Sequence, residues 1–131
     1  MFLDDDNAGR TAFDAAKKDM VLNNADVNFS SCPGLIESEL EDLYKAEVYD
    51  AIIVNECGIA LYSPPAMGKK KFSDRLRHHL KTRGKPSEES DVMAVKIKIA
   101  HSAAQLGLDA VIPGRIGPLE ALAAQILAKM Q

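Results

Sequence analysis

The sequence contains little cysteine and no long apolar run. Its two cysteines, Cys32 and Cys57, are too few and too widely spaced for a zinc knuckle, and a single disulfide would require an oxidising compartment. We therefore interpret both as ordinary thiols. No apolar stretch approaches the roughly 18 residues that span a bilayer, and no basic-then-apolar leader is visible. These absences predict a cytoplasmic protein with no membrane partner.

Internal repeats and low-complexity segments are also absent, and the length fits one domain over residues 1–131. Within it, an acidic part (1–62) precedes a basic and helical part (69–131). Residues 1–56 carry 13 of the 19 acidic residues and four of the 16 basic ones, whereas residues 69–85 carry eight basic residues and one acid, Asp74. The first part predicts affinity for cations. The second is compatible with either a solvated helix face or a phosphate-backbone partner.

The chain opens with "MFLDDDNAGR", an apolar run that ends in carboxylates. Residues 1–4 are predicted to form a buried strand, and a helix is expected from about residue 10 to residue 18, with Phe13, Ala16 and Met20 as its apolar stripe. Residues 26–30 alternate as a second strand. Strand, helix and strand in this order predict an α/β unit with parallel strands, in which ligand-binding groups gather beyond the carboxyl ends of the strands.

Asp4 and Asp6 lie at that predicted edge. Two residues apart in an extended segment, their side chains point the same way, and their charges repel unless something positive lies between them. The alternative is an exposed acidic turn in which Asp6 or Asn7 caps the following helix.

A second acidic segment, "IESELEDLY", occupies residues 36–44. Ser38 and Glu41 match a capping box at a helix start, which leaves Glu37, Glu39 and Asp42 crowded together. If both acidic turns follow neighbouring strands, the carboxylates of Asp4 and Asp6 should lie near Glu39 or Glu41, within the roughly 4 to 8 Å that bridging cations span.

The rest of the chain is predicted to be mainly helical. Residues 47–56 suit either a strand or a helix, and we favour a helix. Further helices are expected over 73–81, 88–106 and from residue 118 onward. Their expected buried stripes are Phe72, Leu76 and Leu80; then Val92, Val95, Ile99, Ala103 and Leu106; and finally Leu119, Leu122, Ile126 and Met130.

Several motifs share an Asp-x-Asp core. A calcium-binding EF-hand loop counted from Asp4 would place Ala8 and Ala15 where oxygen ligands are required, so that motif is excluded. A phosphatase of the haloacid dehalogenase type would follow its aspartates with Gly-Thr or a close variant, and Asn7-Ala8 fits this poorly.

"LDDDNAGR" resembles the Asp-x-Asp-x-Ala-Gly motif of Toprim domains, and "ESELEDLY", "KKKFSDRL" and "GKP" are similar to later segments of the OLD (overcoming lysogenization defect) family of Toprim nucleases. The resemblance implies an α/β fold with a partial Toprim-like parallel sheet, flanking helices and a helix-rich C-terminal part. It also implies a two-metal site that holds Mg²⁺ or Mn²⁺ and cleaves a phosphodiester bond in nucleic acid, with DNA as the expected substrate. The implied metal ligands are Asp4, Asp6, Glu39, Glu41 and Asp42.

The same resemblance suggests a lysine that neutralises developing phosphate charge. Lys96 is our first choice and Lys98 the second, so that Asp4, Asp6 and Lys96 form the expected catalytic set; a solvated position on a helix is the alternative for either lysine. The predicted contacts to nucleic acid are Lys69, Lys70, Lys71, Arg75 and Arg77.

Toprim domains carry a catalytic Glu on their first strand, and OLD-type proteins carry an ATPase domain; neither is recognisable in this sequence. We therefore expect the site to be incomplete in this chain alone, and to be completed by a second copy or by a partner chain that extends the sheet. The alternative function is a non-catalytic nucleic-acid-binding or assembly module that retains the fold.

Overall fold

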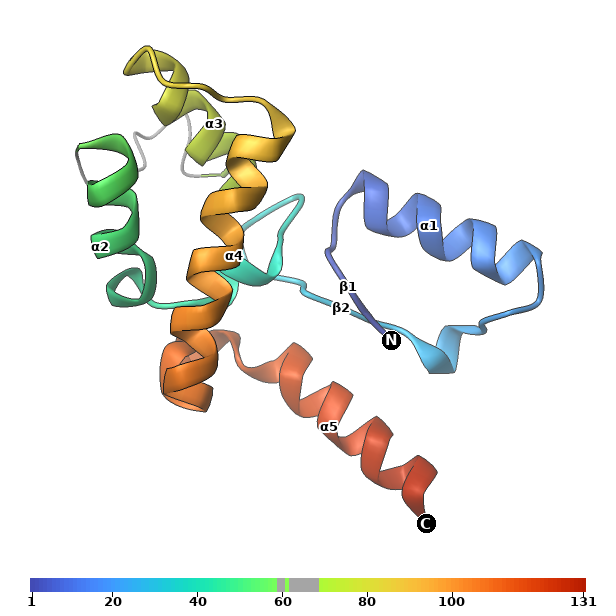
Figure 1. Cartoon of the computed structure of the whole chain (residues 1–131). Coiled ribbons are helices and arrows are strands. Elements are labelled where there is room, and N and C mark those ends of the chain that lie inside the picture. Colours follow the sequence, from blue (N-terminus) through green and yellow to red (C-terminus); the bar gives the residue numbers. More distant parts are fainter. Residues whose placement is uncertain (59–60, 62–68) are drawn as a thin grey trace.

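The computed structural model describes residues 1–58, 61 and 69–131, and most of the proline- and glycine-rich segment "YSPPAMGKKKF" (62–72), which is expected to be a connector, lies outside the described residues. The protein is a mixed α/β molecule that is mostly helical, with a two-stranded parallel sheet (Figure 1). Of the described helices, none is both long and apolar enough to cross a membrane.

The chain begins with a strand, a helix and a strand in the predicted order, but each strand has only two residues, and β1 is partly buried where a buried strand was predicted. β1 (Phe2–Leu3) and β2 (Asn28–Phe29) are parallel, with Phe2 opposite Asn28 and Leu3 opposite Phe29, and α1 (Asn7–Lys18) connects them. The helix begins three residues earlier than expected because Asp6 caps it by accepting the Gly9 N–H at 2.8 Å. Gly9 thus belongs to the first turn of the helix.

The second acidic segment forms a 3₁₀ helix, η2 (Leu40–Leu43), and the predicted capping box of Ser38 and Glu41 is wrong. The box is formed instead by Glu39 and Asp42, one residue further along. The Ser38 hydroxyl donates to the Ser30 carbonyl at 2.8 Å and accepts the Cys32 N–H at 3.1 Å. Ser38 therefore fixes the loop that follows β2, and the carboxylates on either side are positioned by it.

Three helices form the larger hydrophobic core: α2 (Ala46–Cys57), α3 (Phe72–Thr82) and α4 (Glu89–Leu106). The ambiguous segment 47–56 is helical, as favoured. Phe72, Leu76 and Leu80 of α3 are buried, and so are Val92, Val95, Ile99 and Ala103 of α4, as predicted. Leu106 is 48% exposed, which corrects its assignment to the stripe.

Two short turns, η3 (Gly107–Ala110) and η4 (Pro113–Arg115), lead to α5 (Gly117–Met130), whose start near Pro118 was predicted. The buried stripe predicted for this helix is wrong, because no residue of α5 is buried and Met130 is 78% exposed. The helix contacts β2 through one side and extends away from α2, α3 and α4 (Figure 1). Met20, at the end of α1, is likewise 91% exposed, because no described element covers it.

Candidate metal centre

Asp4 and Asp6 lie in the short segment that connects the carboxyl end of β1 to the start of α1. One oxygen of Asp4, Oδ1, accepts the Leu40 N–H at 3.0 Å and lies 3.5 Å from the Ser30 hydroxyl. Oδ1 of Asp6 is occupied by the Gly9 cap, so Oδ2 faces the other charged groups. A Cβ at Gly9 would overlap the Asp4 carbonyl oxygen, and only glycine lets the helix start this close to the strand end.

Glu39 belongs to the second acidic segment and immediately precedes η2. Its Oε2 accepts the Ser73 N–H at 2.8 Å, a hydrogen bond that ties it to the first turn of α3. Asp4, Asp6 and Glu39 each offer a carboxylate oxygen, and these three oxygens lie within 4.8 Å of one another. The predicted proximity of the two acidic segments is confirmed for these residues.

Two lysines contact the carboxylates. Lys71 Nζ lies 2.6 Å from Asp6 Oδ2 and 3.5 Å from Glu39 Oε1. Lys96 Nζ lies 3.6 Å from Glu39 Oε2 and 3.1 Å from Glu41 Oε2. The structure therefore places Lys96 beside the acidic group, where it was expected, whereas Lys98 pairs with Glu56 on an exposed surface.

Burial and the two lysines shift the pKa of these acids in opposite directions. Burial raises the pKa of Asp4, and it also raises the pKa of Glu41, each against the opposing charge of Lys96. For Asp6, burial is outweighed by the Gly9 N–H and the Lys71 ammonium, which together hold its pKa below the usual value. Both lysines have a raised pKa, since the nearby carboxylates outweigh the effect of burial, and both stay charged.

Asp42 does not join the group of three, although it was among the predicted ligands. Its Oδ2 accepts the Glu39 N–H at 2.9 Å and the Phe72 N–H at 3.1 Å, and its Oδ1 pairs with Arg75 at 2.8 Å. With these partners Asp42 connects η2 to the start of α3. It supports the position of Glu39, and its own oxygens are already bonded.

The five predicted nucleic-acid contacts divide into two kinds. Lys69 and Lys70 are exposed and have no ionic partner within the described ranges. The others are engaged by acids: Lys71 belongs to the carboxylate cluster, Arg75 pairs with Asp42, and Arg77 pairs with Asp74 at 3.4 Å and Glu89 at 2.7 Å.

The acidic group lines an open cleft of about 600 Å³. One wall comes from α1, at Ala8, Gly9 and Ala12, and the other comes from α3 and α4. Lys71 and Lys96 are part of the lining and present positive charge beside the carboxylates, and Arg77 also lines the cleft, together with its ionic partners Asp74 and Glu89. A ligand that combines a cation with phosphate oxygens would find complementary groups for both.

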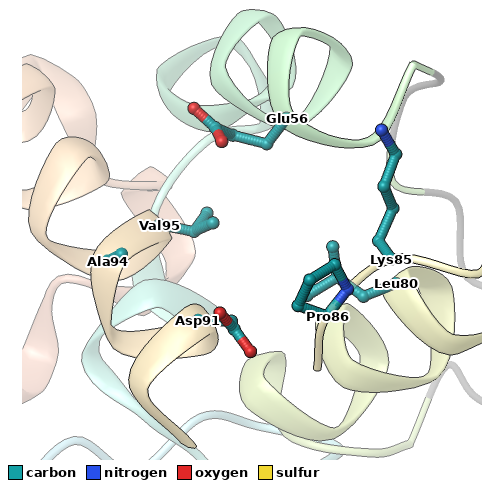
Figure 2. Close-up of a pocket in the computed structure, with 7 residues that line it drawn as sticks. All are labelled: Glu56, Leu80, Lys85, Pro86, Asp91, Ala94 and Val95. Atoms are coloured by element: carbon teal, nitrogen blue, oxygen red, sulfur yellow. The ribbon is translucent and has the colours of Figure 1, made fainter. Parts of the chain in front are cut away.

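A separate pocket of about 190 Å³ lies among α2, α3 and α4 and shares no lining residue with this cleft. Figure 2 shows Glu56, Lys85 and Asp91 around it, together with the apolar side chains of Leu80 and Val95.

Sequence reasoning missed the position of Lys71 in the cluster. Three consecutive lysines, at 69–71, look alike in the sequence. The signal that separates them is the buried Phe72, because the residue that directly precedes a buried helix start is held against the same surface.

Comparisons of the chain with protein-family models, curated proteins and solved structures found no match.

Proposed function

We propose that this protein is a Toprim-like domain of the OLD type that binds Mg²⁺ or Mn²⁺ and, once a second copy or a partner chain completes its site, hydrolyses phosphodiester bonds in nucleic acid, with DNA as the substrate. The observation that carries the proposal is the convergence of Asp4, Asp6 and Glu39, from two separate acidic segments, with ligand oxygens within 4.8 Å of one another. Lys96 lies beside them, on a third segment.

The chemistry of the donors fits these ions. All three groups are carboxylates, and hard oxygen ligands are those that Mg²⁺ and Mn²⁺ prefer. Backbone N–H groups hold each carboxylate at one oxygen: Leu40 for Asp4, Gly9 for Asp6 and Ser73 for Glu39. Such orientation by surrounding groups is typical of metal ligands in proteins.

When bound, the divalent cations would activate a water molecule and stabilise charge on the leaving oxygen. The chain's own residues have distinct roles. Asp4 and Asp6 supply the fixed negative charge at the end of β1, and Lys96 supplies positive charge for the phosphate oxygens that the cation does not contact. The exposed Lys69 and Lys70 are suited to the flanking phosphates of the nucleic acid.

Titration calorimetry with Mn²⁺ tests the proposal. We expect wild-type protein to bind Mn²⁺, and Asp4→Asn or Asp6→Asn to weaken binding by about tenfold or more, since a tenfold loss corresponds to about 1.4 kcal/mol. The matched control is Asp5→Asn, because Asp5 lies between them but pairs with Arg10 at 2.7 Å and accepts from Ser31 at 2.7 Å.

Equal losses in all three variants would contradict a specific site, because simple removal of negative charge would then explain the result. A nuclease assay with Mg²⁺ and with Mn²⁺ on single-stranded and duplex DNA accompanies the titration. Because the first-strand Glu is not recognisable in this sequence, we expect little or no cleavage by the chain alone, and cleavage that a second copy or a partner chain restores should disappear in Asp4→Asn.

The second candidate function is a non-catalytic nucleic-acid-binding module in which the charged groups serve the fold. The contacts of Lys71 and Lys96 with Asp6, Glu39 and Glu41 favour it, because they already neutralise part of the acidic charge. This candidate predicts salt-dependent binding of DNA without any binding of Mn²⁺. The calorimetric titration therefore separates the two functions directly.

A further inference from the structure

The Lys71 ammonium lies against the same carboxylates that form the candidate metal centre. Its Nζ is 2.6 Å from Asp6 and 3.5 Å from Glu39, and its side chain is only 19% exposed. Asp6 and Glu39 are themselves almost completely buried. The ammonium thus occupies a position between two of the three ligands, where a bound cation would be attracted.

The net negative charge of the cluster can be balanced by one further divalent cation. Asp4, Asp6, Glu39 and Glu41 face two ammonium groups, Lys71 and Lys96, so the fully ionised cluster has two more negative than positive charges. The burial that raises the pKa of Asp4 and Glu41 shows the cost of keeping this excess charge out of water.

A divalent cation and Lys71 compete for this position. A cation held by Asp6 and Glu39 needs the oxygens that face Lys71, and its double positive charge repels the ammonium at short range. We expect a bound cation to repel Lys96 less, because the nearer contact of Lys96 is Glu41, which lies outside the group of three ligands. Lysine has a flexible four-carbon stem, so the Lys71 head group can leave without a movement of the backbone.

We propose that Lys71 is the internal counter-ion of the metal centre: cation binding displaces its ammonium from Asp6 and Glu39 into the cleft, where it becomes a ligand for the substrate phosphate. The inference rests on the proposed function, and it names how that site is regulated. Lys71 and Lys96 both line the cleft, so the released ammonium adds to the positive charge of Lys96, whereas Arg77 in the same lining is paired with Asp74 and Glu89. Cation binding and phosphate binding then favour each other, and the coupling is reciprocal.

The first test measures Mn²⁺ affinity in Lys71→Met by calorimetry. Removal of the competing ammonium should tighten Mn²⁺ binding by about tenfold, which corresponds to about 1.4 kcal/mol. The matched control is Lys70→Met, which removes the same charge from the neighbouring exposed residue and should change the affinity much less. Urea denaturation of both variants shows whether they are folded.

The second test uses the wild-type protein and therefore does not depend on how the variant folds. An amine-reactive ester labels lysines, and mass spectrometry gives the rate of labelling at each residue with and without Mg²⁺. Lys71 should be labelled several-fold faster in Mg²⁺, while Lys69 and Lys70 keep their rates.

The outcomes separate this inference from the proposed function. Mn²⁺ binding by wild-type protein, with unchanged affinity in Lys71→Met and no change in Lys71 labelling, would overturn the counter-ion role and leave the metal centre standing. The absence of Mn²⁺ binding from both wild type and Lys71→Met would overturn both. Binding by Lys71→Met alone would overturn the proposed displacement, because the ammonium would then block the site in the wild-type protein and would not leave it when the cation binds.

Discussion

Gly9 is a residue at which the backbone of the site is tightly packed. It lies in the first turn of α1, with its N–H bonded to Asp6, and an added Cβ would meet the Asp4 carbonyl oxygen. Backbone atoms on both sides of this contact belong to the candidate metal centre. The glycine therefore lets the first turn of α1 lie directly against the Asp4 backbone.

Gly9→Ala should destabilise the protein, although alanine normally favours a helix over glycine by about 0.5–1 kcal/mol. The overlap with Asp4 requires a backbone shift, and we expect a loss of about 1–3 kcal/mol in the free energy of unfolding, measured by urea denaturation. Gly114→Ala is the control, because nothing lies within 4 Å of its added Cβ. Stabilisation by Gly9→Ala would show that the strand end can move without cost.

The carboxylates of the candidate site were predictable because carboxylates at two successive turns are visible as sequence patterns. Asp4, Asp6 and Glu39 were predicted in this way, and Lys96 was chosen by its position in its helix. The partners of Asp42 and Lys71 were not predicted, because they depend on how α3 approaches η2. That approach is a tertiary contact, and local patterns do not determine it.

At the scale of the secondary-structure element, Asp42 is the junction between η2 and α3. Its carboxylate is 1% exposed and accepts from the N–H groups of Glu39 and Phe72 and from Arg75. Asp42→Ala should cost about 3–5 kcal/mol of unfolding free energy, the typical effect of removing one partner of a buried ion pair.

The control for this prediction is Asp74→Ala, which removes an acid from the first turn of α3, the turn that Asp42 contacts. Asp74 pairs with Arg77 at 3.4 Å and its side chain is 37% exposed, so the loss should stay within about 1 kcal/mol. Chemical denaturation of both variants measures the two losses of unfolding free energy. Similar losses would mean that the ion pair and the two caps of Asp42 contribute no more than a surface contact.

Helical periodicity predicted most of the elements and only some of their burial. It located α3, α4 and α5 within a few residues because apolar residues repeat at helical spacing. It failed for Met20 and for the Ile126 and Met130 end of α5, which are exposed. A stripe shows which face a helix would bury against a neighbour, but not whether a neighbour is present.

At the scale of the whole molecule, two hydrophobic clusters meet beside the charged site. The larger is formed by α2, α3 and α4, and the smaller contains Cys32, Leu43 and Val111 near the sheet. Tyr44 packs against both. No residue of α1 is buried, so the carboxylates and lysines carry part of the contact between the sheet end and the helical body.

Stability should therefore reside mainly in the larger cluster. Ile99 is fully buried in α4, and Ile99→Ala should cost about 2–5 kcal/mol of unfolding free energy, as large-to-small changes in cores do. Ile126 of α5 is 50% exposed, and the same change there should cost about 1 kcal/mol or less, because half of its surface is already in water. Urea denaturation of the two variants, at low and at high protein concentration, compares them. If Ile126→Ala proved as costly as Ile99→Ala, and the cost grew with concentration, another molecule would have to cover α5 in solution.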